Sequence, residues 1–111
     1  MSLIPKRYDI YLADLNPTIG GEIKKTRPVV VVSQNDMNRY LETIVVCPLT
    51  TNIHPTWRCR LQVICAGKNA EIAIDQIRTI SKQRLIRKID CLSETKAAQL
   101  RRIITEMYGT S

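Results

Sequence analysis

The chain has 111 residues, of which 44% are hydrophobic and 24% charged, which suits one folded domain and excludes an intrinsically disordered chain. Its formal net charge of +7 favours a polyanionic partner (nucleic acid, an anionic membrane or an acidic protein) over a merely solvated basic surface. The longest apolar run, Val29–Val32, is too short to cross a bilayer, and Met1–Arg7 lacks the apolar segment of a signal peptide, so a cytoplasmic location is expected.

The first half of the chain is predicted to form strands around a polar loop. Residues 8–13 alternate in the manner of a strand, and Pro28–Gln34 is a valine-rich run typical of a central strand. Between them, Asn16-Pro17 opens a turn and Gly20-Gly21 gives the loop backbone freedom. Residues 35–40 are predicted to form a turn or a single helical turn, and residues 43–49 a buried strand.

The second half alternates more clearly before it ends in a helix. Residues 58–65 predict a strand with two cysteines, Cys59 and Cys65, in the core and a basic row, Arg58 and Arg60, outside, where it contacts either a polyanion or water. In residues 71–80 the alternation of apolar residues shifts by one position near Asp75-Gln76. This shift indicates either a bulge or a strand buried on both faces.

The C-terminal helix is predicted over residues 93–108, with Ser93 as N-cap and Gly109 as its stop. Ala97, Leu100, Ile104, Met107 and Tyr108 form one apolar stripe, which is expected to pack on the core. The whole chain, residues 1–111, is therefore expected to be a single domain with strands over about residues 7–91. Short strands followed by one helix favour a mainly β fold, a partly open antiparallel barrel.

The cysteines show no metal-binding spacing. Cys47, Cys59, Cys65 and Cys91 form no C-x-x-C pair, and His54 is the only histidine. Buried, reduced thiols are expected, with no metal and no cofactor, and His54 is expected to be an ordinary loop residue.

Three loops carry reactive residue types. The first holds Glu22 and Arg27, the second Thr50-Thr51-Asn52, and the third Asp75-Gln76. Cleaving RNA without a metal requires a base near the 2′-hydroxyl, fixed donors for the phosphate oxygens and a proton for the leaving oxygen. Glu22 or Asp75 could serve as base, Arg27 could hold developing negative charge, and Thr50 could donate to the same phosphate. These residues alone support a basic barrel that binds a polyanion and has the parts of a nuclease.

Four segments of the sequence, taken together, indicate a particular protein family. D-I-Y-L-A-D-L-N-P-T-I-G-G-E, T-R-P-V-V-V-V-S, V-V-C-P-L-T-T and D-Q-I-R-T-I resemble, in order and spacing, the MazF/PemK family of ribonuclease toxins from bacterial toxin–antitoxin pairs. The resemblance implies a small SH3-like antiparallel barrel (the CcdB and MazF fold) and a homodimer. It also implies metal-independent, sequence-specific cleavage of single-stranded RNA to 2′,3′-cyclic phosphate and 5′-hydroxyl ends, and neutralisation by an acidic antitoxin.

The resemblance implies catalytic roles for Arg27, Thr50 and Glu22. Asp75 is a further candidate for a catalytic or orienting group, although the family branch that uses this aspartate has an arginine where this chain has Ala73. The expected RNA-binding residues are Thr51, Asn52, Gln76, Arg58, Arg60, Lys24 and Lys25. The alternative is a non-catalytic toxin of the same barrel fold that inhibits a protein such as gyrase, but the chain lacks the Trp-Gly-Ile tail of those toxins.

Overall fold

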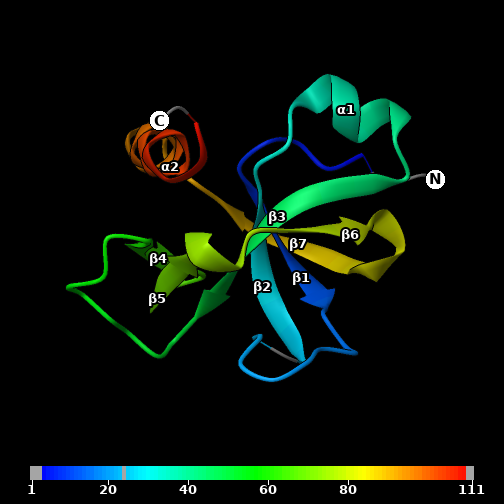
Figure 1. Ribbon diagram of the computed structural model, residues 1–111. Coiled ribbons are helices and arrows are strands. Elements are labelled where there is room, and N and C mark those ends of the chain that lie inside the picture. Colours follow the sequence, from blue (N-terminus) through cyan, green and yellow to red (C-terminus); the bar gives the residue numbers. More distant parts are fainter. Residues whose placement is uncertain (1–3, 24, 110–111) are drawn as a thin grey trace.

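The computed structural model describes residues 4–23 and 25–109, and it confirms a mainly β chain with a C-terminal helix (Figure 1). Two helices, α1 (Asn35–Tyr40) and α2 (Glu94–Tyr108), and two single turns of 3-10 helix, η1 (Ile74–Gln76) and η2 (Lys82–Arg84), accompany the strands. The strands are β1 (Asp9–Asp14), β2 (Thr26–Val31), β3 (Thr43–Thr50), β4 (Arg60–Cys65), β5 (Lys68–Ala73), β6 (Arg78–Ser81) and β7 (Leu85–Cys91).

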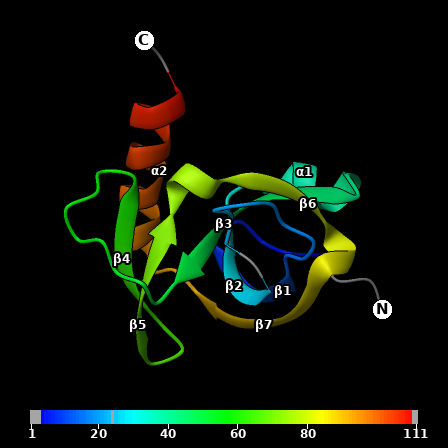
Figure 2. The same ribbon diagram turned by 60° about the horizontal axis from the view of Figure 1, so that its bottom comes forward.

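Strand β3 is shared between two antiparallel sheets. Along most of its length it pairs with β2 and β6 in a sheet of order β6-β3-β2-β1-β7, and its last two residues pair with β5, which in turn pairs with β4. The larger sheet curls on itself into a half-barrel, and α2 lies beside β4 and β5 (Figure 2). The predicted partly open antiparallel barrel is therefore confirmed.

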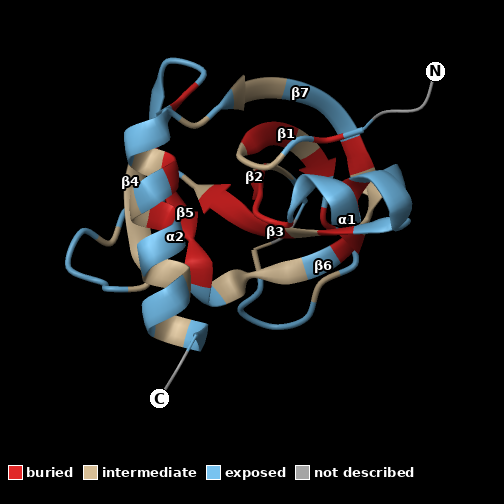
Figure 3. Cartoon of the chain, turned by 90° about the horizontal axis from the view of Figure 1, so that it is seen from above, coloured by how far each residue is buried: buried red, intermediate tan, exposed pale blue. Residues whose placement is uncertain are grey.

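The valine run of β2 is buried on both faces, which explains why its sequence does not alternate. Val29 and Val31 pack inside the curl with Tyr11, whereas Val30 packs on the opposite face in a cluster that includes Leu100 of α2. Burial is accordingly concentrated in β1, β2, β3 and β5, while most of α1 and the outer face of α2 are exposed (Figure 3).

Three strand predictions are wrong in detail. Residues 71–80 do not form one bulged strand, because the backbone makes the 3-10 turn η1 at the position where the alternation shifts and then starts β6, which pairs with β3 instead of β4. The predicted strand 58–65 begins only at Arg60, because turns closed by hydrogen bonds from Trp57 N–H and Arg60 N–H occupy the preceding residues. Strand β2 likewise ends at Val31, before the predicted Gln34.

The predicted helix is confirmed, with the Ser93 hydroxyl accepting the Lys96 N–H as N-cap. At its end, Tyr108 is half exposed, and its hydroxyl donates to the Ile74 carbonyl of η1 at 3.1 Å instead of packing as core. The four cysteines are free thiols, but only Cys47 and Cys65 are buried. The expectation of buried thiols is wrong for Cys91, which is exposed at the end of β7, and Cys59, in the turn before β4, is only half-buried.

Candidate active site

The loop between β1 and β2 folds back on itself and onto η1. The Asn16 side chain accepts the Lys25 N–H at 3.1 Å, which ties the two ends of the loop together. At its tip, Gly20 has a φ of +59°, a left-handed conformation that favours glycine. The Ile23 N–H donates to the Gln76 side-chain oxygen at 2.7 Å, so the loop is fastened to η1. The predicted freedom is thus required at Gly20, and Gln76 holds the loop.

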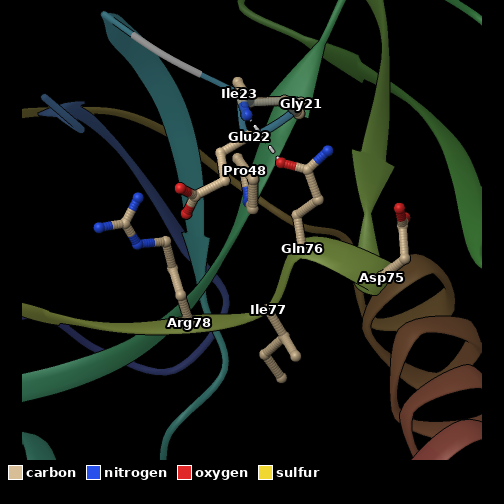
Figure 4. A pocket seen from close by; sticks show the side chains of 8 residues that line it. All are labelled: Gly21, Glu22, Ile23, Pro48, Asp75, Gln76, Ile77 and Arg78. Atoms are coloured by element: carbon tan, nitrogen blue, oxygen red, sulfur yellow. Dashed lines mark hydrogen bonds between the residues drawn. The ribbon is translucent and has the colours of Figure 1, made fainter. Parts of the chain in front are cut away.

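A cavity of about 430 Å³ opens between this loop, the end of β3 and η1. Figure 4 shows Glu22 and Arg78 on one side of Gln76 and Asp75 on its other side. One Glu22 oxygen accepts the Ile19 N–H at 2.6 Å, which holds the carboxylate within the loop. The lining residues are Gly21, Glu22, Ile23, Pro48, Asp75, Gln76, Ile77 and Arg78. The first and third predicted loops therefore meet at one cavity.

Arg27 lies in β2, directly after the loop that lines the cavity, and Thr50 ends β3, which lines the cavity through Pro48. Strands β2 and β3 are antiparallel and pair from Val29–Pro48 to Val31–Val46, whereas Arg27 pairs with Ala13 of β1 and Thr50 with Glu71 of β5. Side chains alternate along a strand, so Arg27 shares a face with Val29, and Thr50 shares it with Pro48, which lines the cavity. Arg27 and Thr50 are both half-buried. The predicted guanidinium and hydroxyl thus come from neighbouring strands, each two residues beyond the Val29–Pro48 pair, and neither residue is among those that line the cavity.

Asp75 is tied to an arginine on both carboxylate oxygens. Its Oδ1 and Oδ2 accept from Arg60 Nε at 2.8 Å and Nη2 at 3.3 Å. Burial alone would raise the pKa of the Asp75 carboxyl, but the hydrogen bonds and charge of Arg60 outweigh it and hold the pKa below its ordinary value. A carboxylate with a lowered pKa is a weaker proton acceptor, so this geometry suits an orienting role for Asp75 better than that of a general base.

The prediction that Arg60 belongs to an exposed basic row is wrong, because its side chain is only 6% exposed. Its Nη1 donates to Glu71 Oε2 at 2.8 Å, and Glu71 is fully buried. Glu71 also accepts the His54 N–H at 2.7 Å and the Gln62 side-chain amide at 2.6 Å. Arg60 therefore forms ion pairs with two carboxylates, and Glu71 anchors the loop between β3 and β4.

Most of the other predicted RNA-binding residues are exposed. Lys25, Thr51, Asn52 and Arg58 are all accessible, and Lys24 lies outside the described residues. The Thr50 hydroxyl accepts the Asn52 N–H at 3.1 Å, which starts a turn directly after β3. Across residues 4–23 and 25–109, no cluster of three or more His, Cys, Asp or Glu side chains could hold a metal ion.

Sequence reasoning missed Glu71 and Trp57. The signal for Glu71 was an acidic residue at the edge of an apolar stretch, but its partner Arg60 depends on strand pairing that no local pattern gives. The signal for Trp57 was the only tryptophan of the sequence three residues after His54, with Pro55 between them in a position typical of a β-turn.

The fold and the cavity define a small, partly open antiparallel barrel with a site at one edge, and comparison with known proteins gives its family. Residues 6–108 match the family described as "PemK-like, MazF-like toxin of type II toxin-antitoxin system". "Endoribonuclease MazF" of Staphylococcus epidermidis is 36% identical over 100 residues, which cover 86% of this chain and 83% of that protein. The chain therefore belongs to the PemK-like, MazF-like toxin family.

Solved structures show the same fold at lower identity. MazF from Deinococcus radiodurans has a TM-score of 0.86 at 17% identity, with 98% of this chain and all of that chain covered. An "Endoribonuclease in complex with its cognate antitoxin from Mycobacterial species" has a TM-score of 0.80 at 20% identity, with 96% and 97% covered. Within the described part of this chain, no helix is long and apolar enough to span a bilayer.

Proposed function

We propose that this protein is a metal-independent, sequence-specific endoribonuclease toxin that cleaves single-stranded RNA, including mRNA. The 2′-hydroxyl attacks the adjacent phosphate, the bond to the 5′-oxygen breaks, and the products carry a 2′,3′-cyclic phosphate and a 5′-hydroxyl. Family membership and a curated relative that is named as an endoribonuclease support this proposal. The observation that carries it is the pairing of β2 with β3 at Val29 and Pro48, because Arg27 and Thr50 each lie two residues beyond this pair, on strands next to the cavity.

In this mechanism Arg27 and Thr50 stabilise the phosphate as charge develops on its oxygens. The Arg27 guanidinium supplies permanently charged donors in a planar fork, and the Thr50 hydroxyl supplies one further donor. Both are held on a sheet and not on a mobile loop, so little reorganisation is needed when the charge appears. We propose that the same guanidinium also assists the leaving 5′-oxygen.

Glu22 is the better candidate for the general base. It lines the cavity from the β1–β2 loop, whereas both oxygens of Asp75 are bound to Arg60. Asp75 instead acts as an orienting group that fixes Arg60 and the adjoining η1 turn. Gln76 lines the cavity, and we propose that it contacts the RNA together with the exposed residues Lys25, Thr51, Asn52 and Arg58.

The net charge of the chain and one solved structure support RNA and an acidic antitoxin as partners. The net charge of +7 suits both RNA and an acidic antitoxin, and a structurally similar endoribonuclease is bound to its cognate antitoxin. We therefore propose that a cognate acidic antitoxin neutralises this protein, that the active form is a homodimer, and that it acts in the cytoplasm, where its mRNA substrate lies.

The test is incubation of the purified protein with a long RNA in EDTA, followed by mapping of the ends. Cleavage at a short recurring sequence, with 5′-hydroxyl and 2′,3′-cyclic phosphate ends, is expected. Intact RNA, or cleavage that appears only when a divalent ion is added, would contradict the proposal. The same map yields the recognition sequence.

A further inference from the structure

The loop between β3 and β4, residues 51–59, carries an aromatic pair that the proposed chemistry does not use. The rings of His54 and Trp57 are stacked, with centroids 3.8 Å apart and planes inclined by 8°. The Trp57 N–H donates to the His54 carbonyl at 3.1 Å, so a tight turn brings the two rings together. Trp57 is nevertheless 46% exposed, although tryptophan side chains are well buried on average. An exposed, ordered aromatic stack is available to a ligand.

The stack is held in place from below. The Arg60 guanidinium carbon lies 4.8 Å from the centre of the Trp57 ring, a cation–π contact. Arg60 is itself fixed between Glu71 and Asp75, and Glu71 also accepts the His54 N–H. The pair is therefore ordered before any ligand arrives, which reduces the entropy lost on binding.

The stack also lies next to the cavity. Asp75 lines the cavity and binds Arg60, whose guanidinium in turn lies over Trp57. Along the chain, the loop that carries the stack starts directly after Thr50. One guanidinium thus separates Trp57 from the cavity wall, and the exposed Arg58 beside it offers a charge for a neighbouring phosphate.

We propose that an unpaired RNA base next to the scissile phosphate stacks on the His54–Trp57 pair. This inference rests on the proposed function and adds a binding subsite to it. Proteins that hold single-stranded nucleic acid combine cations that follow the backbone with aromatic rings on which bases stack. Every base can stack on an aromatic ring, so this subsite contributes to RNA affinity. Loss of the subsite is therefore expected to raise KM, whereas loss of Arg27 or Thr50 is expected to lower kcat.

Trp57 reports on this subsite because it stacks on His54 and is the only tryptophan in the sequence. The probe is a random-sequence, 12-nucleotide 2′-O-methyl RNA, which cannot be cleaved because it lacks the attacking hydroxyl. The control probe is the same sugar–phosphate chain without bases. Quenching of Trp57 fluorescence is expected with the base-containing RNA and not with the abasic chain, which keeps only the phosphates.

Three variants separate stacking from charge. Trp57→Phe keeps an aromatic ring and is expected to bind within a few-fold of the wild type, whereas Trp57→Ala is expected to bind about 5- to 100-fold more weakly and to raise KM with kcat largely kept. Tyr40→Ala is the matched control, because Tyr40 is an 80% exposed aromatic residue on α1, far from this loop (Figure 1). Its affinity for RNA is expected to be unchanged.

Equal quenching by the abasic chain, or equal affinity of Trp57→Ala and wild type, would overturn the inference. A shift of Trp57 emission on dilution of the protein alone would also overturn it, since a second copy of the chain would then cover the stack. Cleavage of RNA by the wild type in EDTA is measured separately. If cleavage persists without a Trp57 signal, only the stacking inference fails, and if the signal appears without cleavage, only the proposed function fails.

Discussion

The substitution Glu71→Gln tests how the loop between β3 and β4 is held. Glu71 is fully buried and accepts three hydrogen bonds, from Arg60, Gln62 and the His54 N–H, at 2.6 to 2.8 Å. Glutamine has the same shape but no charge, and its amide nitrogen faces either the Arg60 donor, in place of Oε2, or the donors of Gln62 and His54, in place of Oε1.

Removing one partner of a buried ion pair costs about 3–5 kcal/mol, because the other charge stays buried without compensation. Arg60 keeps Asp75, so the lower end of that range, about 3 kcal/mol, is expected here. In a domain of this size such a loss lowers the melting temperature by roughly 10–20 °C. Glu106→Gln removes an equal charge from the exposed face of α2 and is expected to change stability by less than about 0.5 kcal/mol.

The assay is urea unfolding of both variants and the wild type, with free energies extrapolated to water. A loss below about 1 kcal/mol for Glu71→Gln would refute this reasoning, because buried charges with one partner removed cost several times more. Equal losses for Glu71→Gln and Glu106→Gln would refute it as well, since the effect would then come from net charge.

Three further predictions concern pH, the loop fastening and the loop tip. The pKa of Asp75 is lowered in the folded state, so its ion pair stabilises the fold above the unfolded pKa and loses this contribution as pH falls through the folded value. Asp75→Asn should therefore be less stable than wild type at pH 7, and the gap in unfolding free energy should close at acid pH; a gap that is constant with pH would contradict this. Gln76→Ala removes the acceptor of the Ile23 N–H, so amide hydrogen exchange at Ile23 should speed up, with Gln83→Ala on η2 as unchanged control. Gly20→Ala should cost about 1 kcal/mol in urea unfolding, because alanine is strained at a φ of +59°, whereas Gly21→Ala, which meets no neighbouring atom, should cost less.

The local patterns of the sequence predict most of the fold. The Ser93 cap, the apolar stripe and Gly109 locate α2, because caps and helical periodicity are local properties. The η1 turn was missed because a 3-10 turn and a bulge shift the alternation of apolar residues in the same way. Which strand β6 joins is decided by packing across the barrel, and no pattern within residues 78–81 specifies β3 as its partner.

The candidate site could be predicted from the sequence only in part, because some of its contacts join residues on different strands. Residue types and order indicated Arg27, Thr50 and Glu22, but the role of Arg60 depends on Glu71 and Asp75, which lie 11 and 15 residues away in sequence. An arginine on an alternating strand reads as exposed unless the partner strand is known to carry a buried acid opposite or diagonal to it. The distinction between a charge that binds RNA and a charge that holds the fold is therefore visible only in the structure.

The measurement that tests the central claim most directly is the single-turnover cleavage rate, in EDTA, of variants at Arg27 and Thr50. Arg27→Ala and Thr50→Val are each expected to fold as the wild type does and to cleave about 10²–10³-fold more slowly, as is typical when one fixed donor to a developing oxyanion is lost. Thr50→Ser, which keeps the hydroxyl, should retain most of the rate, and so should Arg39→Ala on the exposed surface of α1. Wild-type rates in folded Arg27→Ala and Thr50→Val would contradict the account.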